Sequence, residues 1–208
     1  MLPFFNKLFS NKREIKNANN TQKDVPLEIQ IDKLKEIGFS LNDGLGIDFL
    51  LSEFDRSDFE SDPYGCILHV YGAEREEPDG TWKQNCNDIF LLDTECIEDN
   101  GAYVDILEKF RGLSKGVFNI DNIKDFVDFD SGKAWVSFDF QGIEYKWDIK
   151  VDDDWFDIGL VDKINDLIIK SGSQKRFYTC SQGQNLLVFF LDNVEVKKLN
   201  DLTSCNFK

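Results

Sequence analysis

The fold of this chain is decided by the segment KAWVSFDFQGIEYKWDIKVDDDWFD, residues 133–157. On both sides of Gln141-Gly142 the apolar side chains fall at every second position, which is the period of a β-strand with one buried face. A two-residue turn that ends in glycine favours a tight hairpin. Such a turn pairs Phe140 with Ile143 and brings both apolar sets to one face of the two strands. We therefore predict a β-hairpin over residues 133–151.

The other face of the predicted hairpin is polar. It carries Trp135, Ser137, Asp139, Glu144, Lys146, Asp148 and Lys150. The register places Asp139 opposite Glu144 with Lys146 on the diagonal, an arrangement that metal-dependent nucleases use to hold a divalent ion and position water. A nuclease-like enzyme that uses these three side chains is therefore the alternative hypothesis for function. A solvated sheet face is the simpler interpretation, because Glu-x-Lys is common by chance and Asp139 lies close to the turn.

The patterns around the hairpin predict an α+β fold. Apolar residues at helical spacing predict helices near residues 29–37, 102–110, 158–171 and 192–202. Apolar runs of strand length predict strands near residues 65–72, 89–92, 118–129, 176–179 and 186–191. We expect a mainly antiparallel sheet centred on the hairpin, whose apolar face is covered by the helices near 102–110, 158–171 and 192–202.

The segment GCILHVYG, residues 65–72, has the length and β-branched content of a strand. Cys66 and His69 would then lie on opposite faces, which excludes a Cys/His catalytic dyad within this strand. Because His69 is the only histidine and no Cys-x-x-Cys pair is present, a zinc site is disfavoured. The sequence also lacks Gly-x-Ser-x-Gly, which disfavours a serine hydrolase.

Charge is distributed unevenly along the 208 residues. The formal net charge is −15, but residues 1–26 carry five Lys or Arg against two Asp or Glu, a net of +3, which leaves −18 on residues 27–208. We interpret residues 1–26 as a basic N-terminal segment and linker, and residues 27–208 as a single acidic α+β domain. An acidic body repels phosphate backbones, so it disfavours nucleic acid and favours a basic protein partner. The charge could also serve solubility alone.

Cysteine usage and the N-terminus indicate the compartment. Five cysteines, an odd number without regular spacing, argue against a disulfide framework and favour a reducing environment. The chain lacks the apolar core of a signal peptide, and no apolar run reaches the ~18 residues of a membrane span. We expect a cytoplasmic protein without stable membrane insertion. Phe4, Phe5, Leu8 and Phe9 could form a helix face that makes weak contact with an anionic membrane surface, and a locally docked terminus is the simpler alternative.

An acidic turn follows the hairpin. Consecutive carboxylates on an extended segment point in alternating directions, and the EF-hand pattern is absent, so we expect neither a metal site nor a cofactor. Aspartates before a helix also interact favourably with its positive end. Trp155 and Trp135 stand among charged residues, which is typical of aromatic anchors for a basic partner, although a neighbouring helix could instead bury either ring. The predicted partner-binding residues are Asp152, Asp153, Asp154, Trp155, Asp157 and Trp135.

Three pieces of the chain support a resemblance to a known class of proteins. They are DIFLLDTECIED (residues 88–99), the hairpin segment 133–157 and NLLVFFLDNVEVKKLN (residues 185–200). Over roughly residues 85–200 the chain resembles small acidic bacterial immunity proteins of polymorphic toxin systems. This resemblance implies a non-catalytic role, the binding and neutralisation of a cognate toxin domain, and assigns no binding residues. The excess of Lys over Arg and the many Asn residues are typical of an AT-rich bacterial genome.

Overall fold

The computed structural model describes residues 24–203 and 205–207. The predicted basic segment 1–26 lies outside this part of the chain except for its last three residues, and so does the predicted membrane contact of Phe4, Phe5, Leu8 and Phe9. Among the described residues, no helix has both the length and the apolar content needed to cross a lipid bilayer.

The described chain is an α+β protein, as predicted. Its helices are α2 (Leu27–Glu36), α3 (Ile47–Glu53), α4 (Arg56–Ser61), α5 (Gly65–Gly72), α6 (Ala102–Leu113), α7 (Gly159–Lys170) and α8 (Asn193–Leu202). Its strands are β1 (Glu74–Glu76), β2 (Trp82–Gln84), β3 (Phe90–Asp93), β4 (Ile120–Asp128), β5 (Lys133–Phe140), β6 (Ile143–Ile149), β7 (Arg176–Gln182) and β8 (Asn185–Leu191). The strands form three antiparallel sheets, ordered β1-β2, β3-β8-β7 and β4-β5-β6.

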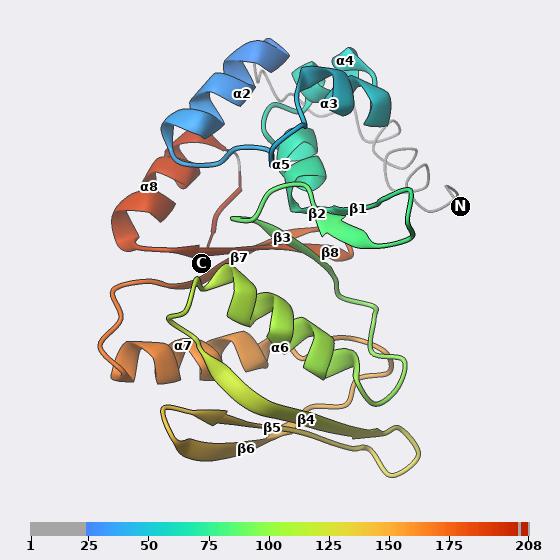
Figure 1. The fold of residues 1–208 in the computed structure, drawn as a ribbon, viewed down its shortest axis with the longest axis vertical. Coiled ribbons are helices and arrows are strands. Elements are labelled where there is room, and N and C mark those ends of the chain that lie inside the picture. The colour runs from blue at the N-terminus through green and yellow to red at the C-terminus, as the bar shows by residue number, and fades with distance from the viewer. Residues whose placement is uncertain (1–23, 204, 208) are drawn as a thin grey trace.

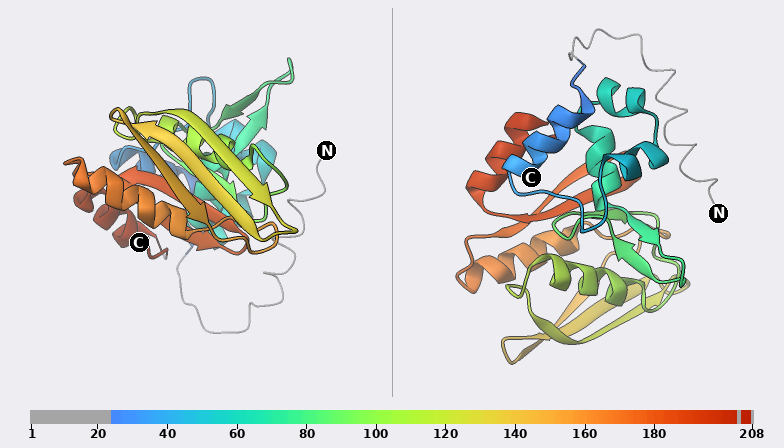
Figure 2. Two further views of the ribbon diagram at one scale, coloured as in Figure 1. Left: turned by 90° about the horizontal axis from the view of Figure 1, so that it is seen from below. Right: turned by 45° about the horizontal axis from the view of Figure 1, so that its top comes forward.

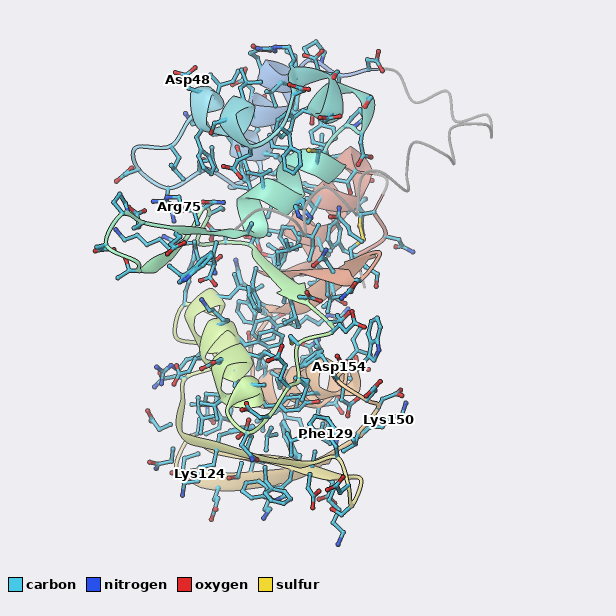
Figure 3. All side chains as sticks on the ribbon, turned by 90° about the vertical axis from the view of Figure 1, so that its right-hand side faces the viewer. Asp48, Arg75, Lys124, Phe129, Lys150 and Asp154 are labelled. Atoms are coloured by element: carbon cyan, nitrogen blue, oxygen red, sulfur yellow. A yellow bond between two sulfur atoms is a disulfide. The ribbon has the colours of Figure 1, made fainter. Side chains whose placement is uncertain are left out.

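The elements stack in four layers (Figure 1). Helices α2 to α5 and α8 lie on one side of the central sheet β3-β8-β7, and α6 and α7 lie on its other side, above the sheet β4-β5-β6 (Figures 1 and 2). Asp48 on α3 and Lys124 on β4 mark the two ends of the long axis (Figure 3). The hairpin sheet is therefore an outer layer of the molecule. The strands are antiparallel, as predicted, but they form three separate sheets and not the one sheet centred on the hairpin that the sequence suggested.

Strand β8 is the element that joins the two cores. All of its residues are buried, and its side chains alternate between the two faces of the central sheet. Leu186, Val188 and Phe190 enter the lower core, which is shared with α6, α7 and the hairpin sheet. Leu187, Phe189 and Leu191 enter the upper core, which is shared with α2 to α5 and α8. A strand buried on both faces has a continuous apolar sequence, as NLLVFFL does.

The predicted hairpin is confirmed in its register and its turn. Phe140 pairs with Ile143, and the pairing continues to Ala134 and Ile149. Gln141 and Gly142 have φ values of 52° and 77°, the two positive values that a type I′ turn requires. Strand β4, in the segment predicted as a strand near residues 118–129, pairs with the free side of β5, so the three consecutive strands form a meander.

The prediction that three helices cover the apolar face of the hairpin is correct for α6 and α7 and wrong for α8. Val196 and Leu199 of α8 pack in the upper core, on the far side of the central sheet. Because β6 is an edge strand, its inward side chains are only partly covered: Tyr145 and Trp147 are half-buried, and Ile143 is exposed.

The prediction of a strand over residues 65–72 is wrong, because this segment is helix α5. All of its residues except Gly65 are buried in the upper core, and a helix that is buried on every side shows no polar face in its sequence. In a helix, Cys66 and His69 lie on neighbouring faces rather than opposite ones, so the exclusion of a dyad on strand geometry no longer applies. Both side chains are buried, at 0% and 5% exposure, and neither faces a substrate-accessible surface.

Two of the five cysteines are joined in a disulfide, although the sequence favoured reduced cysteines. Cys180 and Cys205 form a disulfide, with their Cα atoms 6.2 Å apart. The remaining three cysteines, Cys66, Cys86 and Cys96, take no part in this bond. Sequence spacing did not indicate this pair, because it joins β7 to the segment after α8.

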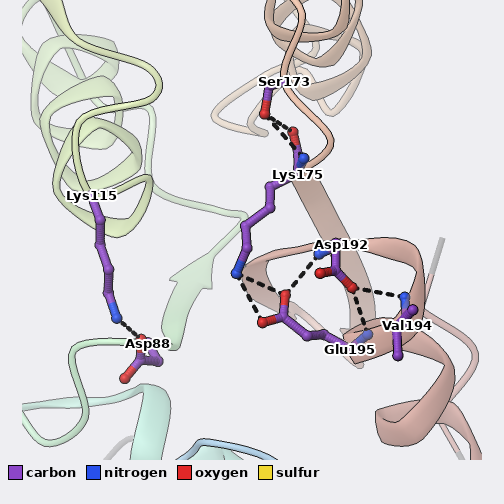
Figure 4. Close-up of polar contacts among 7 residues, drawn as sticks. All are labelled: Asp88, Lys115, Ser173, Lys175, Asp192, Val194 and Glu195. Carbon is purple, nitrogen blue, oxygen red and sulfur yellow. Dashed lines mark hydrogen bonds and ion pairs between the residues drawn. The ribbon is translucent and has the colours of Figure 1, made fainter.

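A capping box forms the start of α8, in the helix that the sequence predicts near residues 192–202 (Figure 4). The Asp192 carboxylate accepts hydrogen bonds from the backbone N–H groups of Val194 (2.8 Å) and Glu195 (2.9 Å). The Glu195 carboxylate in turn accepts from the Asp192 N–H at 2.8 Å and pairs with Lys175. The backbone hydrogen bond from Glu195 is the main reason that the pKa of Asp192 lies below its usual value.

Replacing Asp192 with alanine is expected to lower the melting temperature by a few degrees, because two N–H groups at the helix start lose their acceptor. Since its folded pKa is lowered, Asp192 stabilises the fold above the unfolded pKa, and this contribution is lost as the pH falls through the folded value. Melting curves of the variant and the parent should therefore converge in acid. Asp201→Ala, at the other end of α8, is the control, and an equal loss in both variants would contradict a capping role.

Candidate protein-binding surface

Three loops come together on one side of the molecule. They are the β3–α6, β4–β5 and β6–α7 connections, all on the right-hand side of Figure 1. Figure 3 looks onto this side and shows Phe129, Lys150 and Asp154 near one another. We call residues 93–99, 128–130 and 150–157 the acidic edge. It holds ten carboxylates against one lysine, a net formal charge of −9 out of −15 for the whole chain.

Backbone hydrogen bonds hold the first and third loops together. The Ile97 N–H donates to the Asp154 carbonyl at 2.9 Å, and the Phe156 N–H donates to the Thr94 carbonyl at 2.7 Å. Between these bonds, Glu95 and Trp155 form an antiparallel bridge. Ile97 and Phe156 are buried in the lower core. The two loops are therefore one braced unit, and their carboxylates are presented from a fixed backbone.

Two large aromatic side chains are exposed within the acidic edge. Trp155 is 42% exposed and Phe129 is 41% exposed. Trp155 follows three aspartates, and Phe129 stands between Asp128 and Asp130. The structure thus leaves Trp155 open rather than buried under a helix. Exposed aromatic rings within a charged surface are typical anchors of protein interfaces.

The predicted aspartates of this region have different surroundings. Asp152 and Asp153 are exposed, and Asp154 is half-buried beside the first loop. Asp152 pairs with Lys150 at 2.5 Å, and the hydrogen bond in this pair raises the pKa of the lysine. Asp153 has a φ of 54°, in the left-handed region, where it turns the chain between its neighbours.

Asp157 has a local structural task. Its carboxylate accepts hydrogen bonds from the N–H groups of Lys150 and Gly159, both at 3.0 Å. It therefore ties the end of the hairpin to the start of α7, as expected for an aspartate ahead of a helix. The Lys163 ammonium donates to the Asp148 carbonyl at 2.6 Å nearby, so side chains occupy part of the open edge of β6.

Trp135 lies apart from this loop, on the outer face of the hairpin sheet. Its ring stacks on Phe126 with centroids 6.0 Å apart and 15° between the planes. The Lys146 ammonium lies 3.8 Å from the centre of the indole ring. Trp135 is half-buried by these neighbours, so it presents less surface to a partner than Trp155 does.

The residues of the alternative nuclease hypothesis lie on this same outer face. Asp139 pairs with Glu144 across the strands, as the register predicted. The Asp139 carboxylate accepts a hydrogen bond from the Asn122 side chain at 2.5 Å, and Lys146 is held over Trp135. Within residues 24–203 and 205–207, no group of three or more His, Cys, Asp or Glu side chains is placed to hold a metal ion. These contacts describe a solvated sheet face.

Sequence reasoning missed two parts of the acidic edge. The contribution of residues 93–99 depends on their pairing with residues 150–157, far along the chain. Phe129, by contrast, had a local signal, since it stands between two aspartates at the end of the strand predicted near residues 118–129. The surroundings of the acidic edge also raise the pKa of the Cys96 thiol to about 11. Burial is the main cause, and the nearby carboxylates of Asp93, Asp154 and Glu98 add to it.

A shallow hollow of about 740 Å³ lies elsewhere, between the α2–α3 connection and the β1-β2 hairpin. Its lining includes the cations Arg75, Lys83 and Lys115. Arg75 pairs with Glu77 at 2.6 Å, and Lys115 pairs with Asp88 (Figure 4). Because carboxylates compensate these cations, the hollow does not form a strong anion site.

Known proteins offer no guide to the role of the acidic edge. Comparisons with protein-family models, with curated proteins and with solved structures found no match for this chain. The function must therefore be inferred from the geometry, charge and exposure of the surface itself.

Proposed function

We propose that this protein is a non-catalytic bacterial immunity protein, which binds and neutralises a basic toxin domain through the acidic edge. The observation that carries the proposal is a net charge of −9 together with two exposed aromatic rings on one side of the molecule, where backbone hydrogen bonds hold two of the three loops together. The sequence resemblance to immunity proteins supports the role, and the acidic composition supports a basic partner rather than nucleic acid. We place the protein in the bacterial cytoplasm, where an incoming toxin domain would have to be neutralised.

Charge and aromatic residues would make separate contributions to such a complex. The carboxylates attract a basic surface over several ångströms and so increase the association rate, an effect that salt screens. The rings of Trp155 and Phe129 become buried on contact, and they mainly slow dissociation. A preformed surface adds to affinity, because little backbone order has to be acquired on binding.

The direct test is co-expression with the toxin domain encoded beside this gene. Rescue of growth, together with a complex of the two chains on a sizing column, is the expected result. Toxicity that persists despite a soluble, folded protein, with no complex formed, would reject the proposal. A purified protein that cuts nucleic acid with Mg²⁺ or Mn²⁺, and stops doing so in Glu144→Ala, would establish the nuclease alternative instead.

The variant Asp152→Asn/Asp153→Asn/Asp154→Asn is expected to lower the association rate constant by up to about tenfold at low salt. The dependence of that rate on salt should weaken as well, because three of the carboxylates that attract the partner are neutral. Stopped-flow or surface-based kinetics would measure both effects.

The matched control for this variant is Asp32→Asn/Asp48→Asn/Asp201→Asn. It changes the net charge by the same amount at exposed positions on α2, α3 and α8. If both variants slow association equally, net charge alone attracts the partner, and the acidic edge has no special part in it.

A further inference from the structure

The five cysteines fall into two chemical classes. Cys66 and Cys86 are fully buried, and burial raises the pKa of the Cys86 thiol to about 11, like that of Cys96. With pKa values this high, the thiols of Cys86 and Cys96 are largely protonated near neutral pH and react slowly. Cys180 and Cys205 are only half-buried, and they are bonded to each other. Reagents in solution can therefore reach this pair more easily than Cys66 and Cys86. Cys96 is half-buried as well, but its raised pKa leaves little reactive thiolate near neutral pH.

The disulfide connects the edge of the central sheet to the last part of the chain. Cys180 lies in β7, Cys205 follows α8, and 25 positions separate them in sequence. Both side chains pack against the upper core. The closed loop thus contains β8 and α8, which are the elements that carry most of the C-terminal contribution to that core.

The segment after α8 covers part of the upper core. Phe207 is 4% exposed, and its ring meets that of Phe189 on β8 edge-on, with centroids 4.9 Å apart. The Asn200 side chain accepts a hydrogen bond from the Phe207 N–H at 2.8 Å and donates to its carbonyl at 3.4 Å. The disulfide is a covalent addition to these contacts, two residues before Phe207. Its presence or absence therefore changes how firmly Phe207 covers β8.

We propose that Cys180 and Cys205 form a reversible thiol–disulfide latch, which fastens residues 205–207 over the upper core when a small-molecule disulfide oxidises it. In a reducing cytoplasm the pair is a dithiol, and only non-covalent contacts hold the segment. They are those of Phe207 with Phe189 and Asn200, and the hydrogen bond from the Thr203 hydroxyl to the Cys205 carbonyl at 3.4 Å. Under oxidising conditions the bond forms and the segment is locked. This inference is independent of the proposed partner, because it concerns the side of the central sheet that faces α8.

The oxidation proceeds by two exchange steps with a reagent such as glutathione disulfide. The thiolate of one cysteine attacks the reagent, forms a mixed disulfide and releases one glutathione thiol. The thiolate of the other cysteine then attacks the protein sulfur of the mixed disulfide and releases the second glutathione. Two protein thiols together lose two electrons and two protons, and one glutathione disulfide becomes two thiols. A dithiol reductant reverses both steps.

The first experiment counts thiols in the full chain. Protein that has been reduced and then treated with glutathione disulfide should show three alkylated cysteines after denaturation, against five in reduced protein. Peptide mapping should join Cys180 to Cys205. Five alkylated cysteines after oxidation, or glutathione stably retained on Cys180 or Cys205, would overturn the proposal.

The second experiment measures what the latch does. Oxidation should raise the melting temperature by about 5–10 °C, as expected for a disulfide that closes a loop of this size. Once carboxypeptidase has removed Lys208, it should release Phe207 about tenfold faster from reduced than from oxidised protein, because local opening exposes it. Cys180→Ser/Cys205→Ser should lose both differences, and Cys96→Ser should keep them. If the two redox forms of the parent protein have equal melting temperatures and equal digestion rates, the disulfide does not hold residues 205–207 in place.

Discussion

Replacing Phe177 with alanine is expected to lower the free energy of unfolding by about 3–5 kcal/mol, the range measured for large cavities in protein cores. Phe177 lies on β7, is 0% exposed and faces the lower core. Its ring stacks on Phe110 with centroids 4.7 Å apart and meets Phe190 at 4.8 Å and Phe118 at 6.2 Å. The variant removes the ring through which β7 contacts α6 and β8. These elements cannot move together to fill the cavity that it leaves.

Chemical denaturation measures this change, and Phe129→Ala is the matched control. The control makes the same change, Phe to Ala, at a side chain that is 41% exposed. It should therefore lower the free energy of unfolding by less than about 1 kcal/mol. Similar losses in the two variants would mean that the packing of the lower core is not as described. The slope of the denaturation curve must stay constant for the comparison to hold.

Replacing Trp155 with alanine is expected to weaken binding of the toxin domain at least thirtyfold, or about 2 kcal/mol, most of it as faster dissociation. Trp155 is the largest exposed side chain of the acidic edge, and the backbone on both sides of it is held by hydrogen bonds. Because its ring is already exposed in the free protein, removing it should leave the melting temperature nearly unchanged. The change in affinity would therefore report the interface rather than the fold.

Trp82→Ala is the control for this experiment. Trp82 is 63% exposed and lies on β2, in the β1-β2 sheet and outside the acidic edge. The Trp82→Ala variant should have the same association and dissociation rate constants as the parent protein. If Trp82→Ala weakens binding and Trp155→Ala does not, the partner binds near the β1-β2 hairpin, and the assignment of the acidic edge is wrong.

Local features of this protein were predictable because the residues that determine them are close in sequence. The hairpin register follows from the alternation around Gln141-Gly142, and both are contained in residues 133–151. The capping box of α8 needs only Asp192 and Glu195. Helices α6 and α7 each present one apolar stripe, whose period is visible without knowledge of the partner.

The error over residues 65–72 has the opposite cause. In a helix with one polar and one apolar face, the helical period is visible in the sequence. Helix α5 is surrounded by the upper core and has no polar face, so its sequence shows no such period. A run of eight mostly apolar residues fits a buried strand as well as a buried helix. Gly72 illustrates the deciding factor: a Cβ at this position would lie 3.0 Å from the Leu91 nitrogen, so the end of α5 packs directly against β3.

The sequence by itself determined the class of the fold, the hairpin with its register, the start of α8 and the excess of negative charge. Only the tertiary structure decided which elements share a core, why α8 and the hairpin lie on opposite sides of β8, and which loops form the acidic edge. The pairing of residues 93–99 with residues 150–157, and of Cys180 with Cys205, depends on how whole layers pack. The physical reason is that a turn or a cap involves neighbours whose identity can be read directly, whereas each long-range contact depends on the burial of many apolar side chains at once.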